Sequence, residues 1–187
     1  MSISQNNYLA KFLKTASKIE EHELRATLGS FFLVVILMSA YYILRPVRDA
    51  MASDWSDAEV SWLWTLNFFI STAVVAIYGI AVSRVRFRLL VPSMYGFFAL
   101  TFVVFYVLAS ASSDRTLIDK SFYVWVSVFS LFHISVFWSF MSDLFNKNQA
   151  GRLFSIIAAG ASVGGLIGPS IPSFFSDSLG TDNLMLI

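Results

Sequence analysis

Five long apolar runs dominate the sequence and leave few folds open to it. Each holds close to the ~20 residues that an α-helix needs to cross ~30 Å of hydrocarbon. The predicted membrane helices cover residues 28–47, 61–82, 89–111, 121–142 and 153–176. Because the runs are continuously apolar instead of alternating, transmembrane strands are a poor alternative. The predicted fold class is therefore an all-α membrane protein.

Composition agrees with an environment of lipid. Apolar residues make up 57% of the 187 residues and charged residues only 13%, against roughly 45–50% and 25% in soluble domains. The lipid bilayer is thus the expected surrounding. A net charge of +1 without a basic cluster gives no reason to expect nucleic acid as a partner. The absence of cysteine excludes disulfides and thiolate metal sites.

The first 27 residues form a polar segment of mixed charge ahead of the transmembrane domain, 28–187. Apolar residues recur in it at helical spacing: Leu9, Phe12, Leu13, Ala16 and Ile19. This spacing predicts a short amphipathic helix on the membrane surface, and a solvated tail is the open alternative. The last residues, 183–187, look like the start of a sixth helix. We therefore expect the chain to be a fragment of a longer protein.

Basic residues of the polar segments fall on one side of the predicted bundle. That side holds Lys11, Lys14, Lys18, Arg25, Arg84, Arg86, Arg88, Lys147 and Arg152. The connections on the opposite side carry mainly acidic residues. Because positively charged loops tend to stay in the cytoplasm, the N-terminus is predicted to be cytoplasmic. The expected location is a bacterial inner (plasma) membrane.

The end of the first predicted helix, YYILRPVRDAM (41–51), carries the most specific polar pattern. Tyr41, Arg45 and Arg48 stand at i, i+4 and i+7 and so share one helix face. Asp49 lies four residues after Arg45 and can pair with it. Two arginines facing a cavity suit an anionic ligand such as phosphate or carboxylate. Alternatively both extend to the outer interface, which runs against the charge bias of the loops.

Weaker polar stripes cross two other predicted helices. In the second helix, Asn67 and Ser71 lie four residues apart; in the fourth, Ser127, Ser130 and His133 follow at steps of three. Asn67 and His133 are candidate substrate contacts. Histidine titrates near neutrality, so His133 is also a candidate proton acceptor. A hydrogen bond from His133 to a neighbouring helix is the commoner arrangement.

Small residues line one face of the fifth predicted helix. Gly160, Gly164 and Gly168 stand at steps of four, with Gly165 and Pro169 on the adjacent ridge. This spacing lets two helices approach backbone to backbone, so packing is the main interpretation and substrate contact the minor one. The row is not a phosphate-binding loop, because no Gly-Lys-Ser/Thr follows it.

Together these features resemble the N-terminal half of a major facilitator transporter. Those transporters carry a tight loop with a glycine, an acid and basic residues between helices two and three. Here Gly79 precedes Arg84, Arg86 and Arg88, while Ser83 stands where the acid would be. Topological charge alone also explains these arginines. The resemblance implies two six-helix halves, with a C-terminal half as the partner of this one.

Two stretches carry a narrower resemblance, YYILRPVRDAM (41–51) and AGRLFSIIAAGASVGGLIGP (150–169). They are similar to bacterial nucleotide transporters, the ATP/ADP-translocase-like proteins related to organelle and parasite ATP:ADP antiporters. What this resemblance implies is exchange of nucleotides across the membrane without hydrolysis.

The leading hypothesis is a secondary transporter that exchanges organic anions, nucleotides first, by alternating access. In it, Arg45 and Arg48 attract phosphates, Asp49 holds an arginine while the site is empty, and Tyr41 or Tyr42 stacks on a ring. One alternative is a major facilitator of another solute, a drug, sugar or peptide. Another is a non-transporting membrane protein that assembles with a partner through the glycine face.

Enzyme activity is not expected. The sequence has no paired-histidine metal motif, no Gly-x-Ser-x-Gly turn and no pair of carboxylates within a predicted membrane helix. No cofactor and no metal ion are predicted.

Overall fold

A computed structural model describes residues 19–84 and 87–183, without the side chains of 81, 83, 87–88 and 175–183. This part of the chain is helical and contains no strand. Its helices are α2 (Glu21–Met51), α3 (Asp57–Arg84), α4 (Phe87–Ala111), α5 (Thr116–Leu144) and α6 (Lys147–Asn183). All five are long and apolar enough to cross a membrane. The predicted all-α architecture with five such helices is confirmed.

Most helices extend beyond the apolar runs from which they were predicted. The first starts at Glu21 rather than at residue 28, because Glu20 and Glu23 form a capping box there. The predicted surface helix at 9–19 lies almost wholly outside the described residues. At the other terminus α6 continues as one helix to Asn183. The predicted start of a sixth helix falls on its last residue and on 184–187, which lie outside the description.

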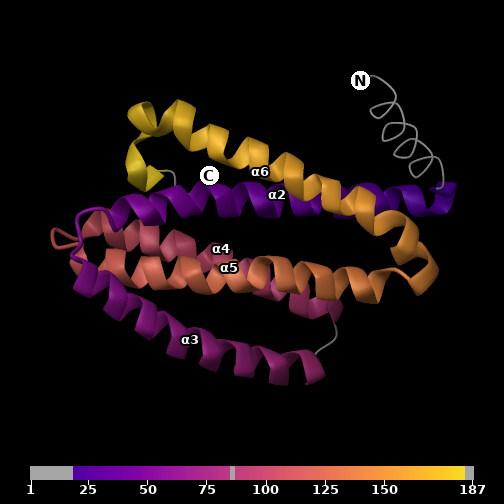
Figure 1. Cartoon of the computed structure of the whole chain (residues 1–187), viewed down its shortest axis with the longest axis horizontal. Helices are drawn as coiled ribbons and strands as arrows, with labels where there is room; N and C mark the ends of the chain where they lie inside the picture. The colour runs from indigo at the N-terminus through magenta and orange to yellow at the C-terminus, as the bar shows by residue number, and fades with distance from the viewer. Residues whose placement is uncertain (1–18, 85–86, 184–187) are drawn as a thin grey trace, which may run out of the picture.

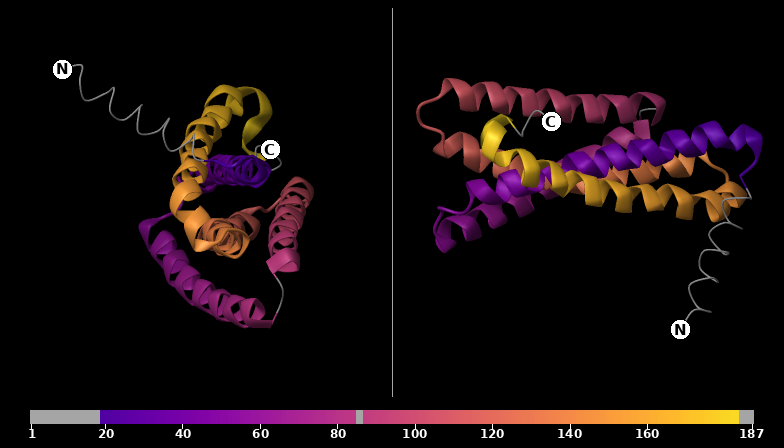
Figure 2. Two further views of the ribbon diagram at one scale, coloured as in Figure 1. Left: turned by 90° about the vertical axis from the view of Figure 1, so that its right-hand side faces the viewer. Right: turned by 90° about the horizontal axis from the view of Figure 1, so that it is seen from above.

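Helix α5 occupies the middle of the bundle (Figures 1 and 2) and packs against α2, α3 and α4. Helix α6 runs along α2. Successive helices alternate in direction, so the start of α2 and the α5–α6 connection lie at one end of the bundle (Figure 1). The α2–α3 and α4–α5 connections lie at the other end. The described connections that the sequence pattern assigned to the same side therefore lie at the same end of the bundle.

Aromatic rings fill the contact between α4 and α5. Phe98 and Phe102 of α4 both meet Phe129 of α5 edge-on, with ring centroids 5.1 Å and 5.4 Å apart. Such edge-to-face pairs stabilise packing beyond the area they bury. Large apolar side chains such as Ile36 and Leu100 remain exposed on the outside of the bundle. An exposed apolar surface of this kind is suited to contact with lipid.

The glycine row of α6 lies directly against α2. A Cβ atom added to Gly164 would stand 2.5 Å from the carbonyl oxygen of Val35, and one on Gly160 would stand 2.7 Å from that of Phe31. At Gly168 the nearest atom would be Cβ of Tyr42, at 2.7 Å. Only glycine permits so close an approach of two backbones.

This contact bears on the alternative of a partner that assembles through the glycine face. Helix α2 of the same chain already covers Gly160, Gly164 and Gly168. The adjacent ridge is partly covered as well, since a Cβ on Gly165 would lie 3.4 Å from the Tyr42 ring. Pro169 is exposed within α6. The glycine face thus serves packing inside the chain.

Glu23 joins the start of α2 to the start of α6. Its Oε1 atom accepts hydrogen bonds from Arg152 Nη2 at 2.7 Å and from Gln149 Nε2 at 3.0 Å. The residue is only 3% exposed. A carboxylate held by an arginine and an amide is a strong, charge-assisted contact between two helix ends.

We expect Glu23→Gln to lower the thermal unfolding temperature of the detergent-purified chain by ~2–4 °C. The substitution removes the charge that Arg152 contacts, while the side chain keeps its size. The matched control is Glu21→Gln, since Glu21 is exposed two residues away on the same helix. Equal unfolding temperatures for the two variants would contradict a bridging role for Glu23.

Candidate functional site

Two polar stripes meet between α2 and α5, which run antiparallel. We name this contact the polar seam; it consists of Tyr41, Arg48, Ser127, Ser130 and His133. At each end of the seam, a contact joins α2 to α5. The Tyr41 ring stacks on the His133 ring, with centroids 4.6 Å apart and planes inclined by 20°. Arg48 Nη1 donates a hydrogen bond of 3.2 Å to Ser127 Oγ.

Arg48 is the charged residue most firmly held in the seam. Its Nε and Nη2 atoms donate to Asp49 Oδ1 at 2.9 Å and 2.7 Å. Its guanidinium carbon lies 5.1 Å from the centroid of the Tyr123 ring, within the range of a cation–π interaction. The side chain is 17% exposed. Contacts from two helices therefore hold one cationic group in a fixed orientation.

Arg45 lies beside this arrangement and is held more loosely. Its Nε is 3.9 Å from Asp49 Oδ2, and both side chains are about half exposed, at 51% each. Asp49 thus stands between the two arginines and offers one oxygen to each. An anion that replaced this carboxylate would meet two guanidinium groups from successive turns of one helix.

The two tyrosines of the motif have different surroundings. Tyr41 faces α5 and stacks on His133. Tyr42 faces α6, where its Cβ and ring lie over Gly168 and Gly165. Of the two, Tyr41 is the one that the fold places in the polar seam.

Tyr123, which together with Ser127 orients Arg48 from α5, was not among the residues that the sequence singled out. Tyr123 is buried beneath the guanidinium, and its hydroxyl accepts a 2.9 Å hydrogen bond from Trp64 Nε1 of α3. Trp55 meets the Tyr123 ring edge-on, with centroids 5.6 Å apart. One signal was available: Tyr123, Ser127 and Ser130 stand at i, i+4 and i+7 and so share a helix face.

His133 is enclosed at the inner end of the seam. Its Nδ1 atom lies 2.9 Å from the carbonyl oxygen of Ser130, and its ring is covered by Tyr41 on one side and by Phe129 at 5.4 Å. The residue is 4% exposed. In this conformation a solute does not reach the ring.

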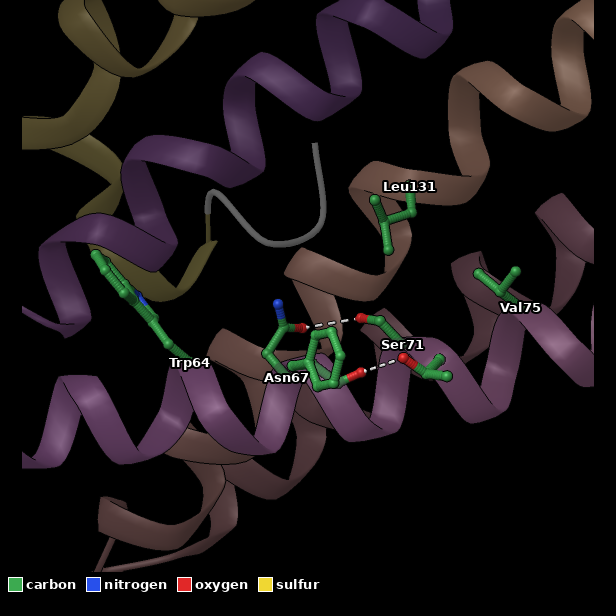
Figure 3. Close-up of a pocket in the computed structure, with 7 residues that line it drawn as sticks. Trp64, Asn67, Ser71, Val75 and Leu131 are labelled. Atoms are coloured by element: carbon green, nitrogen blue, oxygen red, sulfur yellow. Dashed lines mark hydrogen bonds between the residues drawn. The ribbon is translucent and has the colours of Figure 1, made fainter.

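Asn67 lines a separate groove of about 450 Å³ between α3 and α5. Figure 3 shows the lining residues, which are Trp64, Asn67, Phe68, Ser71, Thr72, Val75 and Leu131. Within it, Ser71 Oγ donates to Asn67 Oδ1 at 3.2 Å (Figure 3). The structure therefore does not place Asn67 with the arginines, and Trp64 is the residue that the groove and the Tyr123 contact share.

The basic connection after α3 is described only in part. Arg84 ends α3 with an exposed side chain, and Gly79 is exposed with open space around the position of an added Cβ. The side chains of Arg86 and Arg88 lie outside the described residues. The loop's predicted role as a transporter motif stays a prediction.

No family model, curated protein or solved structure matches this chain. The described helices are those of a multi-pass membrane protein. Among the described residues, one group of three potential metal ligands lies close together, Glu20, His22 and Glu23. Arg152 contacts both glutamates of this group, Glu20 at 3.7 Å and Glu23 at 2.7 Å. It is therefore an ion-pair cluster, and we assign no metal to it.

Proposed function

We propose that this chain is the N-terminal half of a secondary active transporter that exchanges organic anions, with nucleotides such as ATP and ADP as cargo. One observation carries the proposal: Arg48 is held at 17% exposure between two apolar helices and is neutralised by the half-exposed Asp49. A charged residue in such a position is costly and normally marks a ligand pathway. An anion is the ligand that its charge selects.

In this proposal Asp49 is an internal substitute for the cargo. Phosphate oxygens displace its carboxylate and accept hydrogen bonds from Arg48, whose orientation Ser127 and Tyr123 maintain. The side chain of Arg45 is half exposed, and its Nε lies 3.9 Å from Asp49 Oδ2. In this proposal it turns to contact the same phosphate from the other side. Once the cargo leaves, Asp49 neutralises the arginines again. The empty site therefore never exposes two uncompensated cations to lipid.

Orientation and assembly follow from the distribution of charge. We propose that the end holding Arg25, Arg84, Lys147 and Arg152 is cytoplasmic, as the positive-inside rule requires. The arginine site then opens to the outer side of a bacterial inner membrane. A C-terminal half-bundle of the major facilitator type would complete the pathway, and rocking of the halves would provide alternating access.

The test is exchange by the protein that contains this chain, reconstituted in liposomes. We expect labelled ATP to enter liposomes preloaded with ADP in a saturable manner, and to enter empty liposomes much more slowly, because exchange requires a counter-substrate. Unlabelled ADP should compete, while glucose and a dipeptide should not. Saturable uptake of a sugar, drug or peptide that ignores nucleotides would contradict the proposed cargo and favour another major facilitator substrate.

A further inference from the structure

Nε2 of His133 is a buried polar atom with no hydrogen-bond partner among the described residues. The opposite ring nitrogen, Nδ1, lies 2.9 Å from the Ser130 carbonyl and is thereby the protonated one of a neutral ring. The lone pair of Nε2 is then unsatisfied in the middle of a membrane bundle. Such an arrangement is unfavourable, and an unsatisfied buried polar atom calls for an explanation.

We propose that His133 binds a proton at Nε2, and that this proton and the anion at Arg45 and Arg48 favour each other's binding. The inference rests on the proposed function and adds a coupling ion to it. A hydronium ion transfers its proton to Nε2 and leaves as water, so one O–H bond breaks, one N–H bond forms and the ring becomes imidazolium, with Nδ1–H still directed to Ser130.

The surroundings of His133 suit a cation that is formed transiently. The Tyr41 ring stacks on the His133 ring at 4.6 Å and the tilted Phe129 ring lies 5.4 Å away, and aromatic faces attract a cation. Other titratable groups packed around it are tyrosines: Tyr95 of α4 donates to the His133 carbonyl at 2.8 Å, and Tyr78 of α3 meets the neighbouring Phe132. Helix α6 has no charged residue between Arg152 and Asp177.

Separate hydrogen bonds at successive turns of α5 lie between His133 and the arginine site, and they involve different atoms of each serine. Arg48 donates to Ser127 Oγ, Ser130 Oγ donates to the Ser127 carbonyl at 2.6 Å, and His133 bonds to the Ser130 carbonyl. His133 stands six positions after Ser127, which is ~9 Å along the helix axis. A negative charge bound at about this distance attracts a proton on His133. With an effective dielectric constant of ~20, this attraction raises the proton affinity of His133 on the order of tenfold.

Tyr41 supplies a second connection, through α2. It stacks on His133 and lies one helical turn before Arg45. Movement of α2 against α5 would shift the arginines and uncover the His133 ring in a single step. Anion binding and access of water to Nε2 are coupled by this geometry.

The chain contains two histidines, so His22→Gln leaves His133 as the one reporter. We would label this variant with ¹⁵N-histidine, place it in lipid nanodiscs and follow the imidazole resonances between pH 4 and 9, without ligand and with saturating ATP. Binding of labelled ATP to the same sample is measured in parallel. His133→Gln in the unaltered chain confirms the assignment, and Arg45→Gln plus Arg48→Gln is the control for coupling.

We expect one titration, at Nε2, with proton affinity about tenfold higher when ATP is bound, and no ATP effect in the arginine control. A ring that stays neutral over the whole range would overturn the proton site. An unchanged titration in samples that do bind ATP would overturn the coupling alone. If ATP fails to bind, the proposed function and the coupling fail together, and the titration without ligand still decides whether His133 takes a proton.

Discussion

Replacing both arginines of the site, as Arg45→Gln plus Arg48→Gln, should weaken ATP binding by the purified chain about 100-fold or more. Each hydrogen bond to a charged group contributes ~1.5–3 kcal/mol, and every ~1.4 kcal/mol changes a dissociation constant tenfold. Glutamine keeps much of the length of arginine but lacks its charge. Arg48→Gln alone should account for most of the loss, because contacts from two helices orient Arg48 whereas Arg45 is half exposed.

The matched control for this experiment is Arg25→Gln. Arg25 is an exposed arginine of the same helix, at the opposite end of the bundle. Its removal should leave the dissociation constant within about twofold, because it lies more than a Debye length of ~8–10 Å from the site. Equal losses for Arg25 and Arg48 would indicate non-specific attraction of ATP to a basic protein. An unaltered affinity in the double variant would reject the assignment of the site.

Replacing Gly164 with alanine should destabilise the bundle strongly, although the change adds a single methyl group. The new Cβ would stand 2.5 Å from the Val35 carbonyl oxygen and 2.8 Å from Met38 Cβ. Because the nearest atom belongs to the backbone, no side-chain rotation relieves the clash and α2 must move away from α6. Overpacking of this kind costs ~1–3 kcal/mol. Unfolding of the detergent-purified chain, followed by circular dichroism, measures the loss.

Gly96→Ala provides the comparison. Gly96 is an exposed residue inside α4, and an added Cβ would meet nothing within 4 Å. The same chemical change should therefore leave stability unaltered or raise it slightly, since alanine favours a helix by up to ~1 kcal/mol over glycine. If both variants lost stability equally, the effect would come from helix propensity and the packing role of Gly164 would be rejected.

The length of the apolar runs predicted the membrane helices well. A run of about 20 apolar residues must satisfy its own backbone in lipid, and a helix is the local structure that does so. The ends were predicted less well. Helix α2 begins at Glu21, where a capping box stabilises the helix start. Because these residues are polar, the hydropathy of the sequence does not reveal this start.

Site residues on a single helix were also within reach of the sequence. The spacing of Tyr41, Arg45 and Arg48 places them on one face wherever that helix packs. The spacing of Ser127, Ser130 and His133 does the same for α5. The spacing within each helix does not show that these two faces meet. That pairing depends on how α2 and α5 pack against each other.

The amino-acid sequence by itself determined that this chain is a bundle of long apolar helices, with basic residues at one end and a two-arginine face near the other. These are local properties, set by hydrophobicity and by the helical repeat. Only the tertiary structure decided that Arg48 lies over Tyr123, that Tyr41 covers His133, and that Tyr42 instead meets the glycines of α6. Contacts between helices depend on the close packing of residues that are distant in sequence. The spacing of residues within one helix does not specify which helix packs against it.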